Sequence, residues 1–97
     1  MLRITTYRAE DECLLKLEGC LAGPWVPELA RYWRQIAAEP DVRHVRIELT
    51  DVCHVDDAGR ELMTTMYRAG VHFLATGFVM PELVREISET VEHAQRS

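Results

Sequence analysis

Lysine is almost missing from this sequence: Lys16 is the only lysine among 11 Lys and Arg residues. The 16 Asp and Glu residues outnumber these basic residues and give a formal net charge of −5 at pH 7. A protein that binds a phosphate backbone needs a basic surface. The charge balance therefore argues against nucleic acid as a partner.

Long apolar runs are also missing, since no stretch approaches the roughly 20 consecutive apolar residues that span a bilayer. The first twelve residues, MLRITTYRAEDE, contain no apolar signal core. The three cysteines, Cys13, Cys20 and Cys53, are an odd number without zinc-type spacing, which favours reduced thiols. We therefore expect a cytoplasmic protein that does not insert into a membrane and that uses no metal or other cofactor.

The chain is short but apolar enough to fold by itself. Its 97 residues have room for one domain, and 47% of them are hydrophobic. No internal repeat, low-complexity tract or Gly/Ser linker divides them. We therefore treat residues 1–97 as a single domain.

Alternating apolar and polar residues predict four strands, at 2–7, 13–18, 44–49 and 71–76. A polar turn at 10–12 joins the first two strands into an antiparallel hairpin, with the second strand stopping at Gly19. Apolar residues with helical spacing predict one helix from Pro24 to Pro40 and another from Pro81. A further helix lies between them, capped by Gly70, with its apolar positions at Ala58, Leu62, Met63, Met66 and Ala69.

The predicted order is β-β-α-β-α-β-α, which is an α/β fold with a small mixed sheet. Strands buried on both faces usually read as continuous apolar runs, whereas these strands alternate. We therefore expect the helices mainly on one face of the sheet. The other face should carry polar side chains: Arg3, Lys16, Glu18, Arg46, Glu48 and His72.

Three loops, 19–23, 50–57 and 77–80, should meet at the carboxyl ends of the parallel strands, where open α/β sheets bind their ligands. They contain no Lys, no Arg and no Gly-rich phosphate cradle. Their apolar residues stand beside acidic ones, a mixture that suits docking to another protein. Packing beneath the loops is the alternative role for Val55 and Phe78. The loop residues concerned are Leu21, Val52, Val55, Phe78 and Val79, with Asp51, Asp56 and Asp57.

Asp56 and Asp57 stand at the start of the predicted second helix, where a carboxylate normally caps the helix N-terminus. Two negative charges there also disfavour a bound phosphate. A magnesium pocket of the response-regulator kind would need more acidic residues after the first strand and a lysine near the fourth. The sequence has neither. We therefore reject that site.

The segment Cys53-His54-Asp56 could suggest a nucleophile or a metal ligand set. Adjacent residues of an extended chain point to opposite sides, so Cys53 and His54 are poorly placed to share one centre. No second Cys/His cluster completes a four-ligand site, and no paired acid and base stands out. We therefore expect a protein that is not an enzyme.

Several segments in a fixed order resemble the STAS domain family, to which the bacterial anti-sigma factor antagonists belong. The segments are the initial hairpin, the turn 17–21 followed by Gly23-Pro24-Trp25, the strand 45–49 leading to Asp51, the element 55–59 and Ala75-Thr76-Gly77. The resemblance covers nearly the whole chain. It implies a sheet of four or five strands flanked by helices, and a non-enzymatic domain that docks onto an anti-sigma factor with kinase activity.

The resemblance also identifies a departure from the family pattern. In the family, the segment that matches 56–59 is typically Asp-Ser-Ser/Thr-Gly, and its second hydroxyl residue is phosphorylated. Asp56 and Gly59 match, but position 57 is an aspartate and position 58 an alanine. Ala58 has no hydroxyl, so phosphorylation cannot occur there. Asp57 either imitates a phosphorylated state with a smaller charge or serves only as a cap.

Our leading hypothesis is a STAS-like domain that binds a protein partner, without phosphorylation at Ala58. The predicted contact residues are Asp56, Asp57, Ala58, Gly59, Arg60, Leu21, Val55 and Phe78. The alternatives are a ligand-carrying module associated with transport or lipid trafficking, and a scaffold component of a sensory assembly. The scaffold would be a homodimer joined through the polar sheet face or an edge strand.

Overall fold

The computed structural model of the chain describes residues 1–75, 83 and 85–89. Its elements are β1 (Leu2–Ala9), β2 (Glu12–Leu21), α1 (Trp25–Ala37), β3 (His44–Val55), α2 (Asp57–Arg68) and β4 (His72–Leu74). Residues 83 and 85–89, which belong to the third predicted helix, are helical. The predicted order of elements is therefore confirmed over the residues described.

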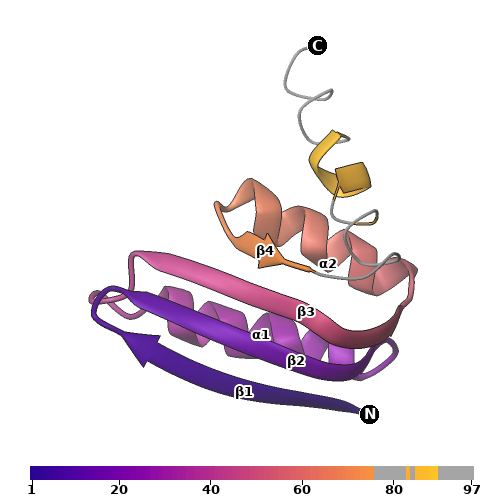
Figure 1. Cartoon of the computed structure of the whole chain (residues 1–97), viewed down its shortest axis with the longest axis horizontal. Coiled ribbons are helices and arrows are strands. Elements are labelled where there is room, and N and C mark those ends of the chain that lie inside the picture. Colours follow the sequence, from indigo (N-terminus) through magenta and orange to yellow (C-terminus); the bar gives the residue numbers. More distant parts are fainter. Residues whose placement is uncertain (76–82, 84, 90–97) are drawn as a thin grey trace.

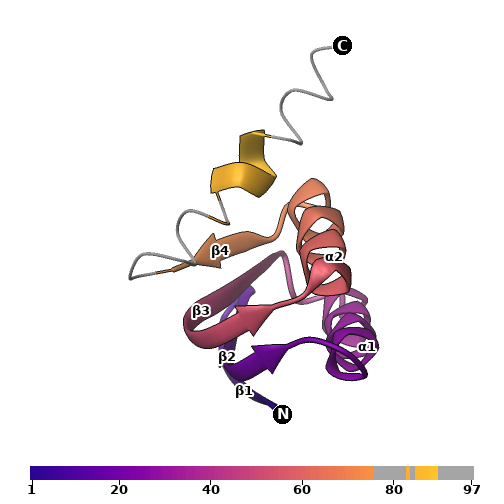
Figure 2. The ribbon, with the colours of Figure 1, turned by 90° about the vertical axis from the view of Figure 1, so that its right-hand side faces the viewer.

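The strands form one mixed sheet in the order β1-β2-β3-β4 (Figure 1). β1 pairs antiparallel with β2, whereas β2, β3 and β4 run parallel to one another. The helices α1 and α2 lie next to each other on one face of this sheet (Figure 2). The small mixed sheet with these two helices on one face agrees with the prediction.

The core lies between the sheet and the helices. Alternate residues of the central strands are fully buried there, and no polar or charged residue is buried in the described part of the chain. Each fully buried Leu, Ile or Met side chain contributes about 1.5–3 kcal/mol. The fully buried side chains are Leu15, Leu17, Leu21, Leu29, Ile47, Leu49, Met63, Met66 and Cys13.

The opposite face of the sheet carries the predicted polar side chains, and Tyr7 and Leu74 are exposed on it as well. The register aligns Lys16 between Thr5 of β1 and Glu48 of β3. The Lys16 ammonium lies 3.5 Å from the Asp51 carboxylate. A second cross-strand pair joins Arg46 to Glu12 at 4.0 Å, and each pair contributes little to stability because it is solvated.

The predicted strand ends differ from the structure most in β2 and β3. β2 does not stop at Gly19 but continues to Leu21, and β3 continues through the predicted loop to Val55. Gly19 has a φ of +109°, and a Cβ there would lie 2.2 Å from the Met1 carbonyl oxygen. The glycine therefore lets β2 pass close to the start of β1, where the Cys20 N–H donates to Met1 O at 2.9 Å.

The buried stripe of α2 also differs from the prediction. Leu62, Met63 and Met66 are buried as expected, but Ala58 and Ala69 are exposed. Gly59 occupies the buried position in the first turn instead. Glycine gives no signal in a hydrophobic pattern. The prediction therefore placed Ala58, rather than its neighbour Gly59, in the buried stripe.

Candidate functional site

Asp56 holds together three segments at the carboxyl ends of β2 and β3. Its Oδ1 accepts a hydrogen bond of 2.8 Å from the Gly59 N–H, which caps α2 as predicted. Its Oδ2 accepts one of 2.9 Å from the Gly23 N–H, in the turn before α1. Its own N–H donates to Leu21 O at 3.2 Å. We call these three contacts the Asp56 clasp.

The clasp favours the charged form of the carboxyl group. The hydrogen bond from Gly23, followed by the one from Gly59, lowers the pKa of Asp56 below its ordinary value of 3.8. Both carboxylate oxygens already accept backbone hydrogen bonds. Asp56 therefore organises the site rather than offering a free acid to a reaction.

Gly59 sets how closely α2 approaches the sheet. A Cβ at this position would lie 2.6 Å from Leu21 O and 2.8 Å from Val55 Cγ1. Leu21 is fully buried, and Val55 is half-buried against the core. The structure buries Leu21 and Gly59, two of the predicted partner contacts, and both support the surface from beneath.

Three of the four remaining predicted contacts lie on the outer side of α2's first turn. Asp57, Ala58 and Arg60 are all exposed. Arg60 Nη2 donates to Glu86 Oε2 at 2.9 Å, which ties this turn to the helical residues 85–89. Phe78 lies outside the described residues. The first turn of α2 thus exposes Asp57, Ala58 and Arg60. We call these three residues the α2 turn surface.

The hydroxyl groups next to this surface have ordinary helical roles. Thr64 Oγ1 donates to Arg60 O at 2.9 Å, and Thr65 Oγ1 donates to Glu61 O at 3.1 Å. Such bonds to the preceding turn are typical of threonine within a helix. Neither side chain is poised as a nucleophile.

The Cys53-His54-Asp56 segment does not converge on a common centre. Asp56 is engaged in the clasp, whereas Cys53 and His54 are exposed. Within residues 1–75, 83 and 85–89, no three His, Cys, Asp or Glu side chains group as metal ligands. The neighbour of Cys53 is instead Cys20, with the two Sγ atoms 3.5 Å apart. Sequence reasoning missed this pair because the register of β2 against β3 was not known.

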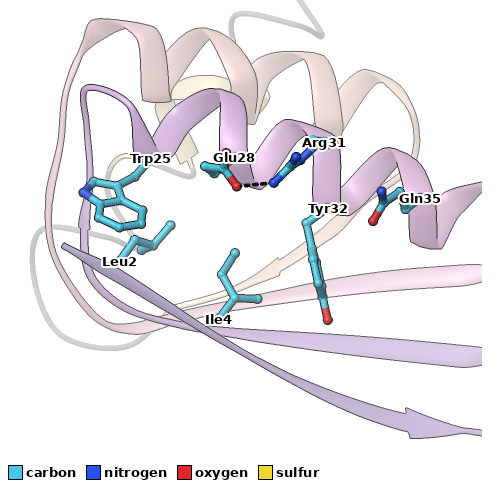
Figure 3. A pocket seen from close by; sticks show the side chains of 7 residues that line it. All are labelled: Leu2, Ile4, Trp25, Glu28, Arg31, Tyr32 and Gln35. Carbon is cyan, nitrogen blue, oxygen red and sulfur yellow. Dashed lines mark hydrogen bonds and ion pairs between the residues drawn. The ribbon is translucent and has the colours of Figure 1, made fainter.

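A groove between β1 and α1 was not predicted either (Figure 3). Its volume is about 380 Å³, and its apolar walls come from Leu2, Ile4, Trp25 and Tyr32. The other lining residues are Glu28, Arg31 and Gln35, and Arg31 Nη2 lies 2.5 Å from Glu28 Oε2. Trp25 and Tyr32 are among the apolar residues whose helical spacing predicted this helix, but both are only half-buried and line this groove.

The sequence predicts a protein that does not insert into a membrane. Among the residues that the structure describes, no helix is long and apolar enough to cross a bilayer.

No protein-family model and no curated protein matches the chain. Among solved structures, the chain is similar to part of Mglu, with a TM-score of 0.62 and 21% identity over 78% of this chain and 20% of that one. A native form of Mglu in 4.3 M NaCl gives a TM-score of 0.54 at 16% identity, over 81% of this chain and 27% of that one. The chain thus spans between a fifth and about a quarter of Mglu, and the likeness shows a shared fold.

The chain is also similar to an antisigma-factor antagonist, a STAS domain from Rhodobacter sphaeroides. The TM-score is 0.46 at 18% identity, over 78% of this chain and 86% of that one.

Proposed function

We propose that this chain is a non-enzymatic protein-binding domain that captures its partner on the α2 turn surface. The proposal rests on the different roles of the residues around the Asp56 clasp. Asp56 and Gly59 fix the position of the turn, while Asp57, Ala58 and Arg60 remain exposed on it. A preorganised surface loses less conformational freedom on binding, which favours its use as a docking site.

The charge around the α2 turn surface favours a partner of opposite charge. Asp57 and Glu61 are exposed at the start of α2, the exposed Arg60 beside them is paired with Glu86, and the whole chain carries a net charge of −5. Complementary charge speeds association and excludes partners of like charge. The partner is therefore a protein with a basic contact surface.

The resemblance to STAS antagonists supports an anti-sigma factor with kinase activity as this partner. Ala58, at the family's acceptor position, is exposed on the first turn of α2. A hydroxyl at that place would be open to a kinase, but alanine offers none. Binding by this chain is therefore independent of phosphorylation at position 58.

Reversing the charge of the turn tests the docking surface. Asp57→Arg should weaken binding to a purified anti-sigma-type kinase at least about tenfold, because like charges facing each other cost several kcal/mol. Asp41→Arg is the matched control: Asp41 is also exposed but lies in the loop before β3, at the other end of the sheet. Isothermal titration measures both. Equal affinities for the wild type and Asp57→Arg would place the interface elsewhere.

Incubation with the same kinase and ATP tests the missing switch. Residues 56–59 of the wild-type chain should remain unlabelled, whereas Ala58→Ser restores an acceptor and shows whether the kinase recognises the segment. Phosphate mapped by mass spectrometry to 56–59 of the wild type would overturn this part of the proposal.

The groove between β1 and α1 favours a second candidate, a ligand-carrying module. Its volume of about 380 Å³ falls within the range of small-molecule sites. The apolar walls from Leu2, Ile4, Trp25 and Tyr32 would suit an acyl chain or another apolar ligand. Native mass spectrometry of the purified chain distinguishes the two candidates, because only the carrier should retain a lipid.

The third candidate, a homodimeric scaffold, is favoured by the position of β1. This eight-residue strand forms an edge of the described sheet, and edge strands offer backbone groups for pairing with a second copy. Light scattering across a range of protein concentrations tests it. A mass that stays at 11.2 kDa would exclude the dimer.

A further inference from the structure

We propose that Cys20 and Cys53 form a reversible dithiol–disulfide pair at the carboxyl ends of β2 and β3. Their Sγ atoms lie 3.5 Å apart although 33 positions separate them in the sequence. Cys53 is exposed and Cys20 is half-buried, so the pair is open to a small reactant. This inference concerns the thiols alone and does not depend on the proposed docking function.

The β-bulge in the parallel ladder explains why these cysteines meet. Gly19 is aligned with Val52 and Cys20 with His54, so Cys53 is the extra residue of β3 at this point. An extra residue locally breaks the regular alternation of side chains. The bulge therefore brings Cys53 beside Cys20, with Cys53 Sγ also 3.5 Å from Gly19 O.

The strand spacing and the separation of the sulfur atoms suit a disulfide. Adjacent strands lie about 4.8 Å apart, which falls within the Cα separation that a disulfide bridges. A bond of about 2.05 Å requires the two sulfur atoms to approach by about 1.5 Å more. Rotation of the exposed Cys53 side chain provides this approach.

The third cysteine provides the contrast. Cys13 is fully buried on β2, seven residues before Cys20 and therefore about 23 Å away along the strand. Burial raises the pKa of its thiol, so little reactive thiolate forms there. Cys13 is thus an internal control for the reactivity of the pair.

The two thiols have different roles. The hydrogen bond with Cys53 is the main cause that raises the pKa of Cys20. The more exposed Cys53 is the attacking thiol, and Cys20 is the thiol that resolves the intermediate. Thiolate is the reactive species, so we expect the oxidation to accelerate as the pH rises.

The reaction balances with a low-molecular-weight disulfide, such as glutathione disulfide, as the oxidant. The Cys53 thiolate attacks one sulfur of the oxidant, whose S–S bond breaks and releases one glutathione thiolate. The Cys20 thiolate then attacks Cys53 Sγ and displaces the second glutathione. The protein loses two protons and two electrons, and the oxidant becomes two thiols. Excess glutathione reverses both steps.

The test is equilibration of the full chain in glutathione buffers of increasing oxidised fraction, followed by alkylation and intact-mass measurement. The wild type and the Cys13→Ala control should each lose two hydrogen atoms and protect two thiols from alkylation. Cys20→Ser should instead retain one glutathione on Cys53, since the resolving thiol is gone. Circular dichroism verifies that each variant is folded.

A thermal scan supplies the second readout. Oxidised wild type should melt at a higher temperature than reduced wild type, because the new bond closes a long loop of the unfolded chain. Cys53→Ser should show no such difference. The proposal is wrong if the wild type stays reduced in every buffer, retains glutathione on Cys53, or forms only disulfides between two chains.

Discussion

At the scale of single residues, Asp56 and Gly59 determine how α2 is attached to the sheet. Asp56 joins the turn before α1 to the N-terminus of α2 through backbone hydrogen bonds to both carboxylate oxygens. Gly59 allows the helix backbone to approach Leu21 O more closely than any side chain would permit. Neither function is visible from residue type alone, since an aspartate at this place predicts only a cap.

We predict that Asp56→Ala lowers the melting temperature by several degrees, since the change removes a helix cap and the bond to Gly23. Asp57→Ala, which changes the exposed neighbour, should leave the melting temperature nearly unchanged. A thermal scan at pH 7 measures both. Equal effects of the two substitutions would show that the clasp does not stabilise the fold.

The same contact predicts a pH dependence. Because the folded pKa of Asp56 lies below the ordinary 3.8, the unfolded chain binds this proton more tightly. The stabilisation is fully present above the unfolded pKa and is lost as the pH falls through the folded pKa. Asp56→Ala should therefore lose less stability than the wild type over this acidic interval, as urea titrations at several pH values would show.

The substitution Gly59→Ala has two opposing effects on the stability of the protein. Alanine favours a helix over glycine by about 0.8–1 kcal/mol. A Cβ only 2.6 Å from Leu21 O would force α2 away from the sheet, and overpacking of this kind costs about 1–3 kcal/mol. We expect the clash to prevail and the midpoint of urea unfolding to fall. A more stable Gly59→Ala variant would contradict the close approach.

At the scale of elements, α2 has one buried stripe and one exposed face. Leu62, Met63 and Met66 pack into the core, whereas Glu61 and Thr65 face solvent. β3 bends past the start of α2 because its ladder with β2 contains register shifts (Figure 1). The helix is therefore held by packing along its length and by the clasp at its N-terminus.

We predict that Met63→Ala destabilises the protein by about 2–5 kcal/mol, the usual cost of removing a fully buried large side chain. Glu61→Ala, on the exposed face of the same helix, should change the free energy of unfolding by less than about 0.5 kcal/mol. Urea unfolding monitored by circular dichroism measures both. A small effect at Met63 would mean that α2 packs loosely.

At the scale of the whole molecule, the buried residues form one cluster. It extends from Leu2 on β1 through both helices to Leu83 and Ile87. A single core in a chain of this length favours one cooperative unfolding transition. Residues 85–89 are also joined to α2 through the Arg60–Glu86 ion pair.

Ile87→Ala tests whether the helical residues 85–89 belong to this core. We expect a loss of about 2–5 kcal/mol, with tryptophan fluorescence and circular dichroism still reporting one common transition. Glu89→Ala, which changes an exposed residue two positions later, should have little effect. Separate transitions in the two signals would show that residues 83 and 85–89 fold independently of the sheet.

Local pattern determined much of this protein. Alternation of apolar residues identified β1 and the first parts of β2 and β3, and helical spacing identified Leu62, Met63 and Met66 as buried. The polar face of the sheet followed from the same alternation, because a strand's side chains point alternately to its two sides. A cap from Asp56 or Asp57 also followed from their position before a helix, and the structure assigns it to Asp56.

Only the tertiary structure decided which distant segments of the chain are in contact. The bulge that brings Cys20 to Cys53, the bond from Gly23 to Asp56, and the close approach of Leu21 to Gly59 all join segments more than 30 positions apart. Each depends on the exact register of β2 against β3, which a shift of one residue would change. Sequence periodicity predicts the face of the sheet on which a side chain lies. The register between strands, in contrast, arises from the packing of the whole sheet.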